Sequence, residues 1–219
     1  MTAEPVRVDR RHRRLRETIE QIVDVAVEVM AEFGVGGLSL AEVARRMGMR
    51  SPSLYGYFDS KNAVYDAVFA RGWRSILATM SPASAGVHEA DDLPAYLLLY
   101  GRRFVGWMLE HPVQAQLMCW RPVPGYEPSP AAYEPAVEML ALARTVFAAL
   151  RERALFRADT DVDRLLRTWT VLTSGVMTQQ LANAPEAPFD DGVFTATLPD
   201  LVSMFLTQFG TTPNHERKP

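Results

Sequence analysis

Residues 39–61 read SLAEVARRMGMRSPSLYGYFDSK, and this stretch carries the clearest structural pattern of the chain. Ser39 lies three residues before Glu42, which is the spacing of a capping box at the start of a helix. Gly48 follows that helix and can take the left-handed conformation that ends it. The stretch therefore predicts a helix-turn-helix over residues 39–58.

The second helix of this pair is expected from Pro52 to Phe58. Ser51 precedes it as the N-cap, and proline suits the first helical position because it has no amide hydrogen to leave unpaired. A longer helix before the pair ends at Gly34, and Ser60 can cap another after it. The apolar positions that mark these two longer helices are Leu15, Ile19, Ile22, Val23, Ala26, Val29, Met30 and Phe33, then Val64, Val68, Ile76 and Met80.

The rest of the sequence also has the pattern of helices, because no stretch alternates in the manner of a strand. Residues 81–92 are rich in Ser, Pro, Gly and Asp and are expected to connect two domains. We therefore predict an all-α protein, with a helix-turn-helix domain over residues 13–80 and a larger helical domain over residues 93–209. Helices of the second domain are expected at about residues 93–110, 112–120, 133–154, 160–183 and 199–209.

The composition argues against a membrane protein, a disulfide-bonded protein and a metalloprotein. The chain has 219 residues, of which 48% are hydrophobic, and this is enough for a sizeable core. The single cysteine, Cys119, cannot form an internal disulfide, and the four histidines are scattered, so no metal or other cofactor is expected. No apolar run has the length of a membrane span, and a cytoplasmic protein is expected.

Charge is distributed unevenly along the chain. Residues 1–75 carry 12 basic and 10 acidic side chains, whereas residues 76–219 carry 11 basic and 16 acidic ones. An arginine arm over residues 1–16 consists of Arg7, Arg10, Arg11, Arg13, Arg14 and Arg16. Such an arm can follow a phosphate backbone, but a disordered, solvated tail has the same composition.

The helix-turn-helix stretch resembles the tetracycline-repressor (TetR) family. The matching features, in order, are Gly34, Ser39, Val43-Ala44, Gly48, Leu54-Tyr55, Tyr57-Phe58 and Ser60-Lys61. The resemblance implies that Ser39, Tyr57 and Lys61 contact DNA phosphates, and that Ser51, Pro52 and Ser53 lie against base edges.

Physical reasoning assigns other residues of the stretch. The apolar side chains expected to pack the two short helices are Val43, Ala44, Met47, Leu54 and Phe58. Tyr55 is expected near the DNA, with its ring either exposed or mainly in the core. Lys61 provides a charged donor beside free helix amides, although an ordinary solvated lysine is the alternative.

Two positions depart from the family pattern. Arg50 occupies a turn position where a small capping residue is common, and Ala41 gives the first short helix no long polar side chain. Sequence specificity is therefore expected to depend on Arg50 and on the arginine arm. Arginine can pair with guanine or with phosphate, so both roles of Arg50 stay open.

The second domain is rich in aromatic residues and methionine, most of which belong to cores. The family resemblance implies that some line a cavity for a small apolar or aromatic effector. The candidates are Phe104, Trp107, Met108, Met118, Trp120, Trp169, Thr173 and Met177. Polar contacts in such a cavity are expected from Gln114, Gln116, Gln179 and Gln180, which can equally be surface or interface residues.

The resemblance also implies an assembly and a mode of action. Helices near residues 160–183 and 199–209 are expected to pair two copies, so that a homodimer binds double-stranded, roughly palindromic operator DNA. The resemblance implies that the protein represses transcription, which is the commoner role in the family, and that the effector releases it from the DNA.

The sequence gives less support to two other functions, that of an enzyme and that of an interaction module. An enzyme would need Cys119 or a carboxylate pair such as Glu134 and Glu138, but Cys119 is expected to be a small buried residue and the glutamates a solvated face. A helical interaction module without DNA binding conflicts with Lys61, Tyr57 and the arginine arm.

Overall fold

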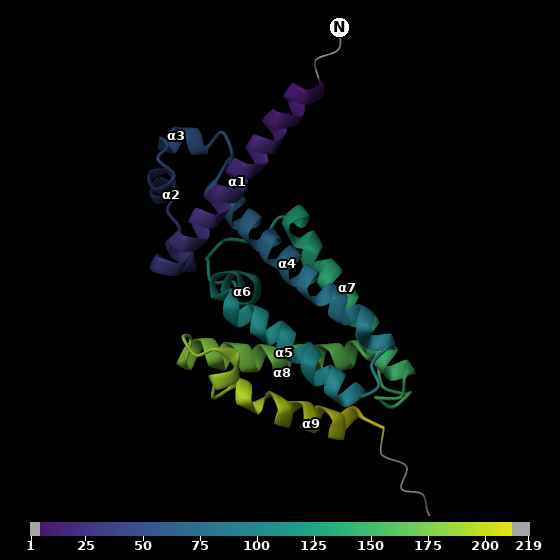
Figure 1. Ribbon diagram of the computed structural model, residues 1–219. Helices are drawn as coiled ribbons and strands as arrows, with labels where there is room; N and C mark the ends of the chain where they lie inside the picture. The colour runs from purple at the N-terminus through teal and green to yellow at the C-terminus, as the bar shows by residue number, and fades with distance from the viewer. Residues whose placement is uncertain (1–4, 212–219) are drawn as a thin grey trace, which may run out of the picture. The chain divides into compact units, whose positions relative to one another are not determined.

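The computed structural model describes residues 5–211, with side chains described from Arg11 onward, and contains α-helices and short 3-10 turns (Figure 1). The α-helices are α1 (Pro5–Phe33), α2 (Leu40–Arg46), α3 (Ser51–Leu54), α4 (Lys61–Ala85), α5 (Leu93–Glu110), α6 (Pro112–Cys119), α7 (Pro130–Glu152), α8 (Val162–Asn183) and α9 (Leu198–Phe209). The 3-10 turns are η1 (Val35–Gly37), η2 (Gly86–His88), η3 (Phe189–Asp191) and η4 (Thr195–Thr197). The predicted all-α class is confirmed, since no strand occurs in the described range.

The chain forms two compact units that are not continuous in sequence. The first unit comprises the residues up to Gly72 together with Val113–Glu134, and the second comprises Trp73–Pro112 and the residues from Pro135 onward. Both α4 and α7 therefore begin in the first unit and continue into the second. These bounds differ from the expected domains, which placed the division in residues 81–92.

Hydrogen bonds and ring contacts hold residues 113–134 to the start of α4 in the first unit. The Asp66 carboxylate accepts from the Tyr126 hydroxyl at 2.9 Å and from the Ser129 amide at 3.2 Å. The ring of Tyr126 lies 5.1 Å from that of Tyr65, whose hydroxyl donates to the Val35 carbonyl. These contacts join residues far apart in sequence, which explains why sequence periodicity assigned this segment to the second domain.

Residues 81–85 are helical, so the predicted connector over residues 81–92 is wrong in its first part. Helix α4 continues through Pro82 to Ala85, and η2 follows directly. The Arg153 guanidinium from α7 donates to the carbonyls of Val87 (2.5 Å) and Ala90 (2.7 Å), and Val87 is buried. Tertiary contacts therefore order a stretch whose composition is typical of a loop.

Helix α1 is longer than the apolar pattern indicated, since it begins at Pro5. Its first turns extend past the core, because Ile22, Ala26 and Met30 are buried whereas Leu15 is exposed. Phe33, which was also placed on the apolar face, is exposed. The described part of the arginine arm is therefore helix rather than a disordered tail, while residues 1–4 lie outside the described range.

Helix α3 ends at Leu54, so its predicted extension to Phe58 is wrong, while most other helix ends show small shifts. Helix α8 is capped by Asp161, which accepts from the Asp163 amide, and not by Asp159 or Thr160. Helix α7 begins at Pro130, a few residues earlier than expected, because Ser129 caps the Ala132 amide.

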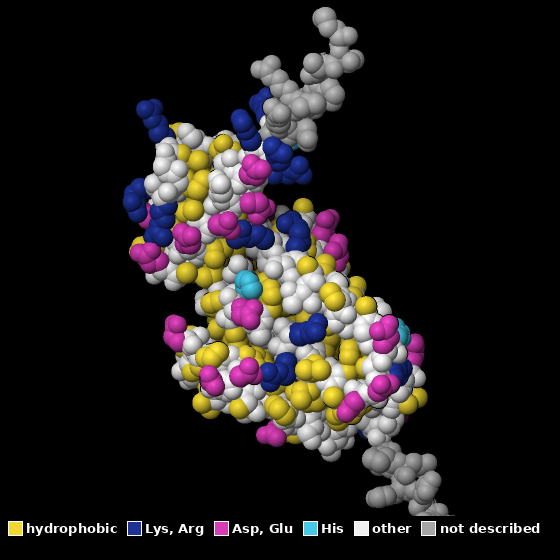
Figure 2. All heavy atoms as spheres, viewed as in Figure 1, with side chains coloured by type: hydrophobic (Ala, Val, Ile, Leu, Met, Phe, Trp, Pro, Cys, Tyr) yellow, Lys and Arg dark blue, Asp and Glu magenta, His cyan; other side chains and the backbone are white. Residues whose placement is uncertain are grey.

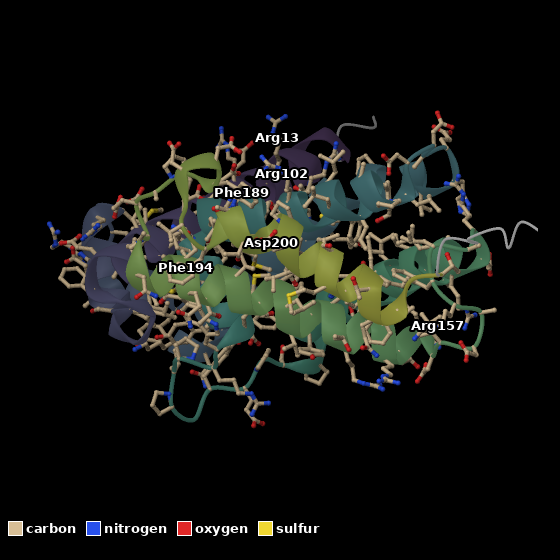
Figure 3. The ribbon with its side chains drawn as sticks, turned by 90° about the horizontal axis from the view of Figure 1, so that it is seen from below. Arg13, Arg102, Arg157, Phe189, Phe194 and Asp200 are labelled. Atoms are coloured by element: carbon tan, nitrogen blue, oxygen red, sulfur yellow. The ribbon has the colours of Figure 1, made fainter. Side chains whose placement is uncertain are left out.

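The second unit packs α5, α8 and α9 against one another (Figure 1), and an aromatic cluster joins α7, α8 and α9. The cluster consists of Phe147, Phe156, Trp169 and Phe205, with ring centroids 5.5 to 6.3 Å apart in the contacting pairs. At the edge of the unit, Arg102 lies over the Phe189 ring at 4.5 Å (Figure 3). Among residues 5–211, no helix combines the length and apolarity needed to cross a membrane.

Candidate functional site

The turn between α2 and α3 has the geometry of a Schellman motif. Gly48 has φ +64°, and its amide donates to the Arg45 carbonyl, while the Met49 amide donates to the Ala44 carbonyl at 2.9 Å. These are the two bonds that satisfy the last carbonyls of a helix. The turn therefore fixes the direction in which the chain enters α3, as the position of Gly48 predicted.

Helix α3 is short and shows most of its side chains to solvent. Leu54 is its one fully buried side chain, whereas Pro52 and Ser53 are exposed. Tyr55, which follows the helix, is 54% exposed, so its ring is not mainly in the core. The N-cap is Arg50 and not Ser51, which is the first helical residue, and the exposed Arg50 side chain makes no capping hydrogen bond.

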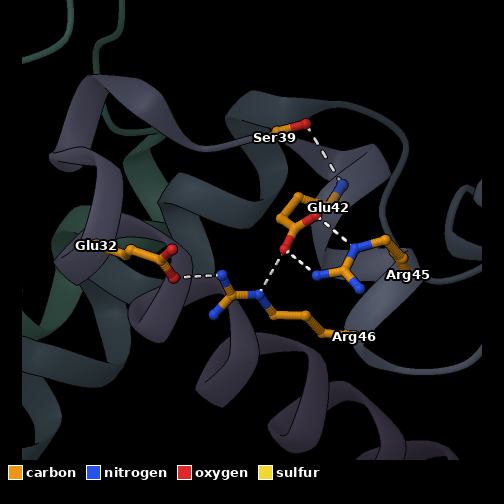
Figure 4. Close-up of polar contacts among 5 residues, drawn as sticks. All are labelled: Glu32, Ser39, Glu42, Arg45 and Arg46. Carbon is orange, nitrogen blue, oxygen red and sulfur yellow. Dashed lines mark hydrogen bonds and ion pairs between the residues drawn. The ribbon is translucent and has the colours of Figure 1, made fainter.

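Helix α2 is capped by Ser39, whose hydroxyl accepts from the Glu42 amide at 3.4 Å. The reciprocal half of the predicted capping box is replaced by ion pairs, because the Glu42 carboxylate accepts from Arg45 at 2.7 Å and from Arg46 at 2.8 Å (Figure 4). Arg46 also pairs with Glu32 of α1. Hydrogen bonds from Arg45 and Arg46 lower the pKa of Glu42 to about 2.

We expect Glu42→Gln to lower the melting temperature of the first unit slightly at neutral pH. The lowered pKa of Glu42 means that its contribution is complete above about pH 4.5 and is lost as the pH falls toward 2. The difference in melting temperature between variant and parent should therefore shrink over that range. Thermal melts of the parent, Glu42→Gln, Arg45→Gln and the double variant test this, and equal effects of Arg45→Gln in both backgrounds would contradict the pairing.

Lys61 begins α4 beside an N-cap. The Ser60 hydroxyl accepts from the Ala63 amide at 3.1 Å, as the sequence predicted. The half-buried Lys61 side chain donates to the Gly36 carbonyl at 3.3 Å and lies 5.5 Å from the centre of the Tyr65 ring. An ammonium group has three donors, so this contact orients Lys61 and leaves further donors for an anion.

In the first unit, the arginine arm and the residues that follow α3 line one groove. Its lining includes Arg11 and Arg14 of α1 with Gly56 and Tyr57, and its volume is about 720 Å³. Lys and Arg side chains gather on this unit in Figure 2. Two further lining residues, His12 and Thr18, were not predicted from the sequence, because neither belongs to the run of arginines or to the apolar face of α1.

The residues proposed for DNA contact all belong to the first unit, and none of them is buried. The exposed side chains are those of Ser39, Arg50, Pro52, Ser53 and Tyr55, and the half-buried ones are those of Ser51, Tyr57 and Lys61. Of the expected core residues, Val43, Ala44, Leu54 and Phe58 are buried, whereas Met47 is half-buried.

A cavity of about 130 Å³ lies in the second unit. Four aromatic residues contribute to its lining: Trp73 of α4, Tyr100 and Phe104 of α5, and Trp169 of α8. The remaining lining residues are Ala136, Met139, Leu140 and Ala143 of α7, and Leu166, Thr170 and Thr173 of α8. The exposed Leu140 and Thr170 mark where the cavity reaches the surface.

Three of the predicted effector residues, Phe104, Trp169 and Thr173, contribute to this lining, and the other five lie elsewhere. Trp107 donates to the Ser75 hydroxyl and stacks on His111 at 4.3 Å, while Met108 and Met177 are buried. Met118 and Trp120 belong to the first unit. Of the glutamines, Gln180 is buried and accepts from the Phe194 amide, which gives it a structural contact.

Residues considered for catalysis show no arrangement of a site. Cys119 ends α6 as an exposed residue, so its expected burial is wrong. Glu134 and Glu138 are both exposed. In the described range, no three potential metal ligands from His, Cys, Asp and Glu gather.

Comparison with known proteins agrees with this geometry. Residues 22–68 match the model of the bacterial regulatory proteins of the tetR family. Over 121 residues, the chain is 30% identical to the HTH-type transcriptional regulator Mb1846 of Mycobacterium bovis, covering 55% of this chain and 51% of that protein. The chain thus spans about half the length of this relative.

Two solved structures share the fold. The TetR family transcriptional regulator PfmR of Thermus thermophilus superposes with a TM-score of 0.65 at 16% identity, covering 87% of this chain and 98% of that one. FadR of Bacillus subtilis, solved in complex with stearoyl-CoA, superposes with a TM-score of 0.65 at 15% identity, covering 86% and 97%. Residues 22–68, which include this helix-turn-helix and its Schellman turn, are thus similar to the bacterial regulatory proteins of the tetR family, and the two solved structures show that the fold of the chain is shared.

Proposed function

We propose that this protein is a DNA-binding transcriptional regulator that inserts α3 into the major groove of operator DNA. The observation that supports this most directly is the geometry of α3, which buries Leu54 and exposes Arg50, Ser53 and Tyr55. A reading helix needs one face packed on its partner helix and another face free for base edges.

In this proposal, base readout and phosphate contacts come from different residues. Arg50, Ser51, Pro52, Ser53 and Tyr55 face the groove. Phosphates are held by the side chains that flank α3, namely Ser39, Tyr57, Lys61 and the arginines of α1. Such phosphate contacts position a protein on the duplex, whereas base contacts specify sequence.

Binding to the DNA beside the protein's own gene, measured by fluorescence anisotropy across a salt series, tests the proposal. We expect saturable binding that prefers this DNA over a scrambled duplex and weakens steeply as salt rises. Equal affinity for both duplexes, or no binding at low salt, would contradict it.

The arginine arm is expected to contribute to the salt dependence. The double variant Arg11→Ala, Arg14→Ala should bind all sequences more weakly and should reduce the salt slope by about 2 for each bound copy, because each lost phosphate contact removes about 0.9 from the slope. The double variant Arg103→Ala, Arg144→Ala removes the same charge from the second unit and should keep the slope. Equal slopes for the two double variants would show that the arm does not touch DNA.

We further propose that α8 and α9 pair two copies about a two-fold axis. Their outward faces carry exposed apolar side chains, with Val171 of α8 71% exposed and Met204 of α9 66% exposed. The small residues Gly175 and Ala182 are also exposed on α8, which allows another helix to approach closely. A two-fold dimer presents two reading helices and therefore fits a palindromic operator.

A charged residue in this face should separate the copies. We expect Val171→Arg to raise the dimer dissociation constant at least about tenfold, since a buried unpaired charge costs several kcal/mol. Sedimentation equilibrium measures this, with Leu99→Arg as the control, because Leu99 is an exposed apolar residue on α5. A variant that stays dimeric at the parent's dissociation constant would place the interface elsewhere.

We also propose that the cavity of the second unit holds a small apolar or aromatic effector that releases the DNA, so that the protein acts as a repressor. Helix α4 supports the link, because it begins with Lys61 and later supplies Trp73 to the cavity lining. The stearoyl-CoA complex of FadR shows that a protein of this fold can hold a ligand. An effector shifts DNA binding only by preferring the state that does not fit the operator.

A further inference from the structure

We propose that the cavity of the second unit selects an uncharged molecule of about one aromatic ring that carries a hydroxyl or a similar hydrogen-bond donor. This inference rests on the proposed effector role of the cavity and names the chemical class of its ligand. It follows from the size of the cavity, the charge of its lining and the hydrogen-bonding state of its two threonines.

The size of the cavity sets the first limit. Its volume of about 130 Å³ is close to that of an engineered apolar cavity of about 150 Å³ that binds benzene. One ring with a small substituent fills this space, whereas a long acyl chain exceeds it.

The Trp169 wall of the cavity is rigid. The indole contacts Phe147 at 5.8 Å and Phe205 at 5.5 Å, and it lies so close to Gly101 that a Cβ there would be 2.9 Å from the indole ring. Trp169 is also buried. Because its neighbours hold it on both sides, Trp169 limits expansion of the cavity in this direction.

The lining offers no counter-charge to a ligand. It contains no Asp, Glu, Lys, Arg or His, and burial raises the pKa of Tyr100, so that its phenol stays neutral. Moving a carboxylate or an ammonium into such surroundings without a partner is strongly unfavourable. Charged ligands of the same size are therefore excluded.

The threonine hydroxyls supply hydrogen-bond acceptors to a ligand, beside the Tyr100 hydroxyl of the same lining, which can donate or accept. Thr173 donates to the Trp169 carbonyl at 3.0 Å, and Thr170 donates to the Leu166 carbonyl at 2.8 Å. Since each hydroxyl proton is engaged within α8, each oxygen can only accept a further hydrogen bond. The ligand that suits these oxygens is a donor, as a phenolic hydroxyl is.

Isothermal titration calorimetry with phenol, toluene, benzoate and a long-chain acyl-CoA tests the inference on the full-length protein. We expect phenol to bind about 2- to 10-fold more tightly than toluene, which is the effect of one hydrogen bond. Benzoate and the acyl-CoA should bind at least about 100-fold more weakly than phenol. Benzoate or acyl-CoA binding as tight as that of phenol would overturn the assigned class.

Variants locate the binding. Ala143→Leu fills the cavity and should weaken phenol at least about tenfold, whereas Ala141→Leu, at an exposed position of the same helix, should not. Thr173→Val removes the buried acceptor and should reduce the preference for phenol over toluene to about 1. Unchanged phenol affinity in Ala143→Leu, or an unchanged preference in Thr173→Val, would overturn the inference.

Operator binding is recorded in the same samples to separate this inference from the proposed function. Phenol binding with the expected preferences supports the ligand class even where the DNA is not released, and that result would overturn only the release step. Release of DNA by a charged or long-chain compound, with no binding of phenol, would overturn the ligand class and leave the regulator intact.

Discussion

Leu54→Ala is expected to destabilise the first unit by about 2–5 kcal/mol, the usual effect of truncating a fully buried leucine, and to abolish operator binding. Leu54 is the one fully buried side chain of α3, and a helix of four residues has almost no stability of its own. The loss of this anchor therefore removes the reading helix as well as part of the core.

Thermal and urea unfolding, followed by circular dichroism, measure the effect of Leu54→Ala. The control is Leu99→Ala, which truncates an exposed leucine of the second unit and should change stability by less than about 0.5 kcal/mol. Phenol binding to the second unit should survive in Leu54→Ala if the two units unfold separately. A Leu54→Ala protein that melts like the parent and binds the operator would contradict the packing described for α3.

Arg50→Ala is expected to weaken binding to the operator by about 5- to 150-fold for each half-site, which corresponds to the 1–3 kcal/mol of one bidentate base contact. Arg50 is the exposed N-cap of α3 and makes no capping hydrogen bond, so its guanidinium is available to the groove. We expect the loss to be much smaller on a scrambled duplex, because a base contact acts only on the cognate sequence.

Arg50→Lys separates the two roles of this side chain. Lysine keeps the charge but loses the planar pair of donors that matches guanine. If Arg50 reads a base, Arg50→Lys should lose most of the preference for the operator. If Arg50 binds phosphate, Arg50→Lys should keep the affinity, and Arg50→Ala should weaken all duplexes alike and lower the salt slope by about 1.

The residues that sequence reasoning placed best are those whose interactions are local. Ser39 and Ser60 cap amides three residues ahead, and the turn closes where Gly48 donates to the carbonyl three residues before it and Met49 to the carbonyl five residues before it. Such contacts depend only on neighbouring residues, so the residue types and their spacing were sufficient. The N-cap of α3 is Arg50 and not the predicted Ser51, because no side-chain hydrogen bond caps this helix and its backbone alone defines where it begins.

The composition of the effector cavity was only partly predictable. Phe104 and Trp107 stand three residues apart on α5, yet Phe104 lines the cavity while Trp107 packs on His111 and donates to Ser75. Both side chains are large and apolar, so hydropathy does not distinguish them. The difference depends on which neighbouring helix each one meets.

Capping, turn chemistry and helical periodicity act over a few residues, and they were sufficient to predict the helical class of this protein and its helix-turn-helix. The place of residues 113–134 in the first unit depends on tertiary contacts, in which Asp66 accepts from Tyr126 and Ser129. The tertiary structure also decided that α4 continues past Pro82, next to the carbonyls that Arg153 binds. These pairings join residues about 60 or more positions apart, and they form only when the chain has folded.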